Sequence, residues 1–215
     1  GLESIGAARE TRLAHAATTL AEALVAGGYD TAALVADRDL APIRGVGDGF
    51  ELYLQRPAGA VAMATLARLW LDWRTFHVAR GLEAPSFFLF LQLNDPGAGG
   101  VPDARYAALF PPRDTSPRAA AEAAYAAAVR AVDDQIGVVL DALAGHGVAA
   151  RTLVVVTSSN GLDFGEDGSR ASGTALDRAQ VQVPLLLRLP ATVAAGQKID
   201  APVSLVDLAP TVLSW

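Results

Sequence analysis

The sequence predicts an α/β protein with a mainly parallel sheet that is flanked by helices on both faces. Short apolar runs, bounded by turn residues, are typical of buried strands. They alternate with segments in which apolar residues recur every three or four positions, as in amphipathic helices. Parallel strands need such crossover helices, and the helices keep both faces of the sheet buried.

The predicted strands are four apolar runs: Thr31–Ala36, Ser86–Leu93, Thr152–Thr157 and Val183–Leu189. The run Thr152–Thr157 is apolar on both alternating faces, so we expect it at the centre of the sheet, with Ser86–Leu93 beside it. Two connections, Asp37–Gly59 and Gly161–Gln180, are predicted to be long loops, and loops of this size are often functional.

Three segments have the apolar spacing of helices. The first carries Leu13, Ala17, Leu20 and Leu24 and is predicted to stop at Gly27-Gly28; the second carries Met63, Leu66, Trp70, Trp73 and Phe76. The clearest begins at Ser116-Pro117, a cap residue followed by proline in the first turn, and is expected to end at Gly145.

Composition excludes several classes of protein. The chain has 215 residues, is 52% hydrophobic and carries a net charge of −6, which suits one α/β domain and disfavours nucleic acid as a partner. It contains no cysteine, so disulfide and thiol chemistry are excluded. No apolar run reaches the length of a membrane span, and residues 1–12 lack the apolar centre of a signal peptide.

Polar residues follow two of the predicted strands. The chain has only two asparagines, and Asn94 follows one strand while Asn160 follows another. Ligands of α/β sheets bind beyond the carboxyl ends of the strands. We therefore expect Asn94, Asp95, Ser159 and Asn160 to border one shallow cleft. The alternative is that these residues only end their strands and form turns.

The order of several segments resembles the sulfatase family, within the alkaline phosphatase superfamily. The resemblance rests on seven segments: Thr19–Ala32, Gly49-Phe50 with Tyr53, Pro85–Leu91, Tyr125–Leu143, Thr152–Gly161, Val183–Pro190 and Val203–Thr211. Within Thr152–Gly161, the letters TLVVVTSSNG resemble the "SDHG" or "SDNG" strand of the family. The resemblance implies an alkaline phosphatase/sulfatase-like fold.

The resemblance also implies chemistry. Members of the family hydrolyse sulfate esters with a divalent metal, usually calcium, and a formylglycine nucleophile. Asn160 matches a metal-binding position, Ser159 stands where the family has an aspartate ligand, and Gly97 stands where the family has an active-site histidine. No residue of this chain matches the nucleophile motif, so we assign no catalytic residue.

The resemblance places residues 1–215 in a single sulfatase-like domain. The segments that carry the nucleophile and the paired metal-binding aspartates lie upstream in the family, and a smaller subdomain follows in most members. Neither is matched here, so we expect the chain to lack both.

Three functions remain open at this point. The first is a sulfatase-like domain that is impaired or inactive as this chain and binds calcium weakly or not at all. The second is a non-catalytic binding module on the same fold. The third is part of an active metal-dependent sulfatase or phosphohydrolase that upstream sequence completes. In each, the expected ligand is a small sulfate or phosphate ester, and the family resemblance favours an exported or periplasmic protein. The sequence does not predict an oligomeric state.

Overall fold

The computed structural model describes residues 18–78, 80, 85–96, 103–165 and 178–214 of the chain. Strands and helices alternate along the described residues. The strands are β1 Asp30–Val35, β2 Leu52–Gln55, β3 Phe87–Gln92, β4 Val154–Thr157 and β5 Leu185–Arg188. The helices are α1 Leu20–Ala26, α2 Ala60–Val78, α3 Ala104–Ala107, α4 Pro117–Gly145, α5 Arg178–Val181 and α6 Leu208–Leu213, with short 3-10 turns at Pro42–Arg44, Ala149–Arg151 and Leu205–Asp207.

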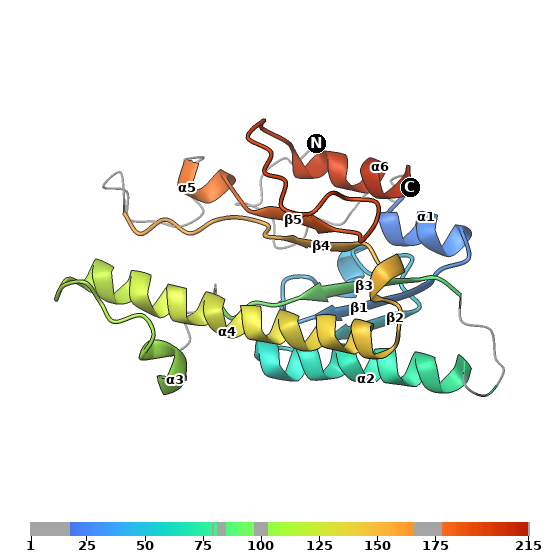
Figure 1. Ribbon diagram of the computed structural model, residues 1–215, viewed down its shortest axis with the longest axis horizontal. Helices are drawn as coiled ribbons and strands as arrows, with labels where there is room; N and C mark the ends of the chain where they lie inside the picture. The colour runs from blue at the N-terminus through green and yellow to red at the C-terminus, as the bar shows by residue number, and fades with distance from the viewer. Residues whose placement is uncertain (1–17, 79, 81–84, 97–102, 166–177, 215) are drawn as a thin grey trace.

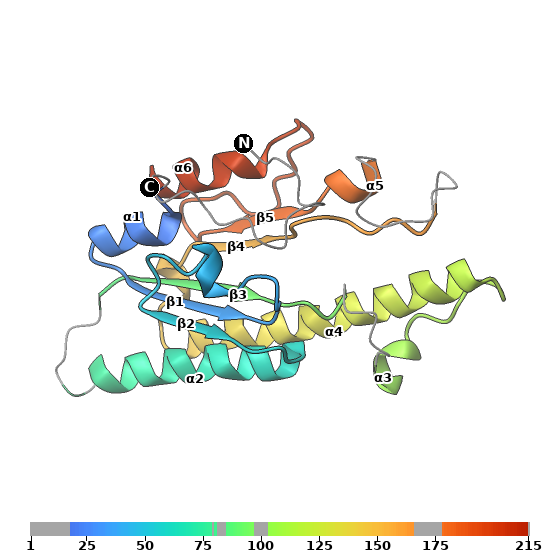
Figure 2. The same cartoon turned by 180° about the vertical axis from the view of Figure 1, so that it is seen from behind.

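The main sheet is parallel, and β1 lies between its two neighbours. Its strand order is β2-β1-β3, with Ala32 opposite Leu52 on one side and opposite Leu89 on the other. Helices α2 and α4 lie on one side of this sheet, and α1 and α6 lie on the other (Figures 1 and 2). The α/β class and the helices on both faces are therefore confirmed.

The expected position of the third apolar run, Thr152–Thr157, is wrong. Residues Thr152–Thr157 do contain a strand, β4, but among the residues that the structure describes it pairs with β5, antiparallel, in a separate two-stranded sheet. It is not central, and β3 is not its hydrogen-bonded neighbour. The reason is that an apolar sequence shows that a strand can be buried but does not show which strand takes the central place. The valines of β4 are only half-buried, whereas residues 31–35 of β1 are all buried.

A strand inside the predicted loop Asp37–Gly59 was missed. Strand β2 is short, and its pattern Leu-Tyr-Leu-Gln follows a turn rich in glycine. That turn needs Gly49, whose φ is +86° and whose absent Cβ would lie 2.1 Å from the backbone nitrogen of Glu22. This turn packs closely against α1 and places β2 beside β1, with which it pairs.

The helices follow the predicted patterns, with one late start. Helix α1 begins at Leu20, where Thr19 and Glu22 form a reciprocal capping box, so it does not continue the predicted repeat back through residue 18. Residues 13 and 17 of that repeat lie outside the described residues. Helix α4 begins after the cap residue Ser116 and runs to Gly145, as expected.

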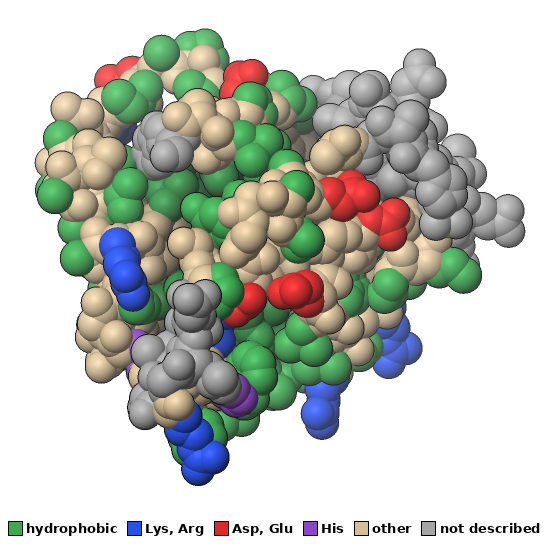
Figure 3. All heavy atoms as spheres, turned by 90° about the vertical axis from the view of Figure 1, so that its right-hand side faces the viewer, with side chains coloured by type: hydrophobic (Ala, Val, Ile, Leu, Met, Phe, Trp, Pro, Cys, Tyr) green, Lys and Arg blue, Asp and Glu red, His purple; other side chains and the backbone are tan. Residues whose placement is uncertain are grey.

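The core lies between the sheet and α2. Leu34, Ala36, Met63 and Ala67 form its fully buried centre, against which partly buried leucines of β2 and β3 pack. The alanines Ala60, Ala64 and Ala67 of α2 are also buried. At the opposite end of the molecule from the carboxyl ends of the strands, basic side chains stand singly on the surface (Figure 3).

One buried cation fixes the amino ends of the strands. Arg74 of α2 is only 8% exposed and pairs with Asp30 at the start of β1. Its guanidinium also donates to the carbonyl of Pro85 and lies 5.1 Å from the ring centres of Trp70 and Phe87. Burial lowers the pKa of Arg74. The side chain therefore joins α2, β1 and β3 through polar and aromatic contacts.

We predict that Arg74→Ala lowers the free energy of unfolding by about 3 kcal/mol, because it leaves Asp30 without its partner beside a buried gap. Chemical denaturation measures this. The control is Arg68→Ala, which removes an exposed pair with Asp72 and should cost at most about 1 kcal/mol. Equal losses for the two variants would contradict the assigned role of Arg74.

Candidate functional site

The candidate site lies at the carboxyl edge of the strands. Because β1, β2 and β3 are parallel, their carboxyl ends share one edge of the sheet. Strand β4 runs in the same direction as β3 (Figure 1). The segments that carry Asn94 and Asn160 therefore leave their strands toward the same end of the molecule. A common cleft between them remains a prediction.

Asp95 has a structural role. Its Oδ1 accepts a hydrogen bond of 2.9 Å from the backbone nitrogen of Ala60, the first residue of α2. A carboxylate at this position satisfies one of the free N–H groups of the helix and interacts favourably with its dipole. Asn94, next to it, is partly buried. Gly97, the residue at the family's histidine position, lies outside the described residues.

The turn after β4 is closed by its own hydrogen bonds. The Ser159 hydroxyl donates to Asn160 Oδ1 at 3.0 Å, and Asn160 Nδ2 donates to the carbonyl of Gly161 at 2.9 Å. The Ser158 hydroxyl donates to the carbonyl of Asn160 at 2.7 Å. Ser159 and Asn160 are exposed. The amide oxygen expected at a metal position thus already accepts a hydrogen bond from its neighbour.

Gly161 anchors this turn to α5. Its backbone nitrogen donates to the carbonyl of Gln180 at 2.7 Å, and a Cβ at this position would lie 1.9 Å from the carbonyl oxygen of Ala179. Only glycine allows the two backbones to approach so closely. The turn is consequently held at the edge of the β4-β5 ribbon.

The described residues of this edge do not fit a calcium site. Calcium takes six to eight oxygen ligands, several of them charged. The described part of the chain contains no group of three or more His, Cys, Asp or Glu residues placed to hold a metal ion. At the matching turn, Ser159 supplies a hydroxyl in place of a carboxylate, and the carboxylate of Asp163 accepts a hydrogen bond from Gly165.

A second polar segment at the same edge was not identified from the sequence. It is the exit loop of β1, residues 36–40, which carries Asp37, Arg38 and Asp39. The Tyr53 hydroxyl donates to the carbonyl of Leu40 at 2.7 Å, and burial raises the pKa of Tyr53. The signal in the sequence is the change from an apolar run to three consecutive charges directly after Ala36.

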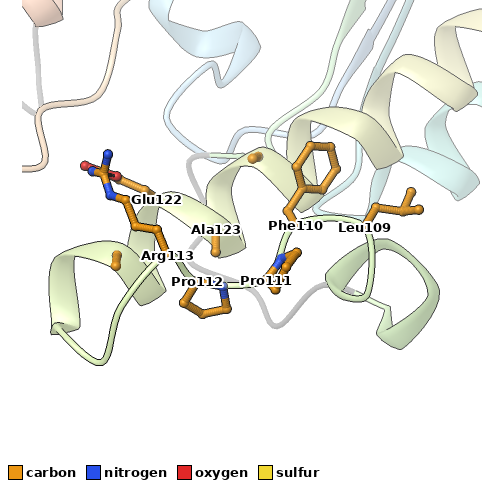
Figure 4. Close-up of a pocket in the computed structure, with 9 residues that line it drawn as sticks. Leu109, Phe110, Pro111, Pro112, Arg113, Glu122 and Ala123 are labelled. Atoms are coloured by element: carbon orange, nitrogen blue, oxygen red, sulfur yellow. Dashed lines mark hydrogen bonds and ion pairs between the residues drawn. The ribbon is translucent and has the colours of Figure 1, made fainter.

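Two surface hollows lie elsewhere, beside the amino-terminal half of α4. One, of about 380 Å³, is lined mainly by Leu109, Phe110, the two following prolines and α4, with the Arg113–Glu122 pair at its side (Figure 4). The other, of about 420 Å³, lies beside Tyr125 and Val129. Neither is lined by the predicted cleft residues.

An α/β sheet with polar turns after its parallel strands is shared by many enzyme domains, and comparison with known proteins establishes which family this one belongs to. The model of the Sulfatase family matches residues 4–215, so the chain belongs to this family. The chain therefore has the alkaline phosphatase-like fold of the sulfatases.

The individual relatives are longer proteins. A sulfatase of Formosa agariphila is 40% identical over 90 residues, which are 42% of this chain and 17% of the relative. Human N-sulphoglucosamine sulphohydrolase is 38% identical over 109 residues, covering 49% of this chain and 20% of the enzyme. The match thus spans about a fifth of the length of these relatives.

A solved structure shows the same fold over almost the whole chain. A protein crystallised with its substrate, D-glucosamine-2-N,6-O-disulfate, superimposes with a TM-score of 0.73 and 15% identity, over 96% of this chain and 62% of that protein. None of the helices in the described ranges has the length and hydropathy to cross a membrane.

We predict that Asn94 and Asn160 face the same cleft. Because the chain has no cysteine, Asn94→Cys with Asn160→Cys introduces the only two thiols, and a short bifunctional thiol reagent should link them within one molecule. The control pair is Asn94→Cys with Arg151→Cys, since Arg151 precedes β4 at its amino end. Linking of the control pair alone, seen by peptide mass mapping, would refute the prediction.

Proposed function

We propose that this chain is a sulfatase-type domain whose strand-end site binds small sulfate or phosphate esters weakly, and which does not hydrolyse sulfate esters as this chain. Family membership gives the ester class. The observation that supports the lack of turnover is the turn after β4, where Ser159, at the position that the family resemblance gives to an aspartate, donates to Asn160 Oδ1.

The physical argument concerns charge. Hydrolysis of a sulfate ester needs a nucleophile and groups that stabilise the charge of the transition state. A hydroxyl that is hydrogen-bonded to a neutral amide supplies neither a fixed negative ligand for a hard cation nor an activated nucleophile. Asn160 is the one residue we would place at a metal, and Asn94, Asp95 and Ser159 are those we would place around the ester.

Upstream sequence is the main alternative source of activity. Relatives of this chain are several times longer than the matched segment, so the activity of a whole protein of this kind is a separate proposal. We also propose an exported or periplasmic location, which family membership favours.

We predict that the purified chain shows no turnover of a chromogenic aryl sulfate and no calcium affinity in the micromolar range. Isothermal titration calorimetry with Ca²⁺ and a spectrophotometric assay measure these. Ser159→Asp should strengthen calcium binding by about tenfold, since it places a carboxylate in a turn whose residues 158–160 are all neutral. It should leave turnover undetectable, because no residue of this chain matches the nucleophile motif.

The control for this experiment is Ser158→Asp, which adds the same charge at the neighbouring position and should bind calcium less tightly than Ser159→Asp. Clear turnover by the unchanged chain, or micromolar calcium affinity, would show that other residues supply the nucleophile and the metal ligands.

A further inference from the structure

The exit loop of β1 is held by the side chains of both neighbouring strands. Gln92, the last residue of β3, accepts hydrogen bonds through Oε1 from the backbone nitrogens of Ala36 and Asp37, at 2.9 and 2.8 Å. Gln55, the last residue of β2, donates from Nε2 to the carbonyls of Asp37 and Arg38, at 2.8 and 2.9 Å. Four backbone groups of the loop are thus satisfied by two amides.

The two glutamines use opposite halves of the same functional group. An amide oxygen only accepts hydrogen bonds and an amide nitrogen only donates them. Gln92 presents its oxygen to two N–H groups, and Gln55 presents its nitrogen to two carbonyls. This division fixes the conformation of residues 36–38, and a site is positioned most accurately when its residues stand on such a rigid support.

The loop presents a guanidinium at the carboxyl edge. Arg38 is exposed and makes no ion pair with a described residue, and the same holds for Arg56, which follows β2 and donates its backbone nitrogen to Val35. Many other arginines of the described ranges are paired with carboxylates: Arg68, Arg74, Arg105, Arg113, Arg118 and Arg130. Within the described ranges, Arg38 and Arg56 thus have no carboxylate partner that an external anion would have to displace.

We propose that Gln55 and Gln92 are positioning residues that hold Arg38 in place to bind the oxyanion of a sulfate or phosphate ester, with Arg56, which follows the neighbouring strand β2, as a second cation. This deepens the proposed function and rests on it. The planar guanidinium matches two oxygens of such a group. Asp37 and Asp39 outweigh the single charge of Arg38, so the loop carries no net positive charge. Anion binding then depends on the geometry of the guanidinium and should favour oxyanions over chloride.

The first test uses the difference between the two glutamines. Gln92→Glu keeps an acceptor for both N–H groups, so slow hydrogen exchange at the Asp37 amide and affinity for sulfate should stay within about twofold of the unchanged chain. Gln55→Glu places a carboxylate against two carbonyls and should lower both by about tenfold, the loss of one to two hydrogen bonds. Circular dichroism checks that each variant is folded.

The second test separates the loop from the ligand. Arg38→Gln should weaken binding of inorganic sulfate and para-nitrophenyl sulfate by about tenfold in a calorimetric titration, while hydrogen exchange of the loop is unchanged. The matched control is Arg151→Gln, an exposed arginine at the amino end of β4, which should bind as the unchanged chain does. Titrations with inorganic phosphate show whether the site distinguishes the two oxyanions, and chloride at equal ionic strength gives the background.

The outcomes are distinct. Sulfate binding no stronger than chloride binding, an Arg38→Gln variant with unchanged affinity, or a Gln55→Glu variant that keeps both exchange protection and affinity would each overturn the proposal. Preference for sulfate or for phosphate, lost in Arg38→Gln, supports it. None of these readouts requires turnover, so aryl sulfate hydrolysis by the unchanged chain would overturn the lack of activity proposed above without deciding the role of Arg38.

Discussion

The burial of residues 31–35 of β1 is the constraint on which the rest of the structure depends. A strand with parallel neighbours on both sides and helices on both faces has no access to water, so its backbone groups must all find partners within the protein. The ladders to β2 and β3 supply these partners along the strand. Beyond Val35, where the ladders end, the side chains of Gln55 and Gln92 take over.

The charged side chains at the two ends of β1 have different surroundings. At its amino end, the buried guanidinium of Arg74 pairs with Asp30 and lies against aromatic rings, so the charge is neutralised inside the protein. At its carboxyl end, Arg38 and Arg56 remain exposed and without an ion pair among the described residues. The buried, paired cation thus lies at the end of the sheet opposite the one where parallel α/β proteins bind their ligands.

The turn after β4 lies in a sulfatase-type domain, and in the structure it is closed by hydrogen bonds among its own residues. Fold and family are shown by the match to residues 4–215. The hydrogen bond from the Ser159 hydroxyl gives the side-chain oxygen of Asn160 a partner within the turn itself. A shared fold with different residues at the strand ends is a common way for related domains to differ in function.

The sequence by itself determined the α/β class, four strand segments, the capped start of α4 and the polar turns at Asn94 and Asn160. Each is a local property, because apolar periodicity and cap residues act within a few positions of the chain. Only the tertiary structure decided that β1 is central, that β4 pairs with β5, that Asp95 caps α2, and that Gln55 and Gln92 hold the loop between them. These depend on which strands become neighbours, and pairing joins residues far apart in the sequence, such as Gln92 and Ala36, whose contact no local pattern records.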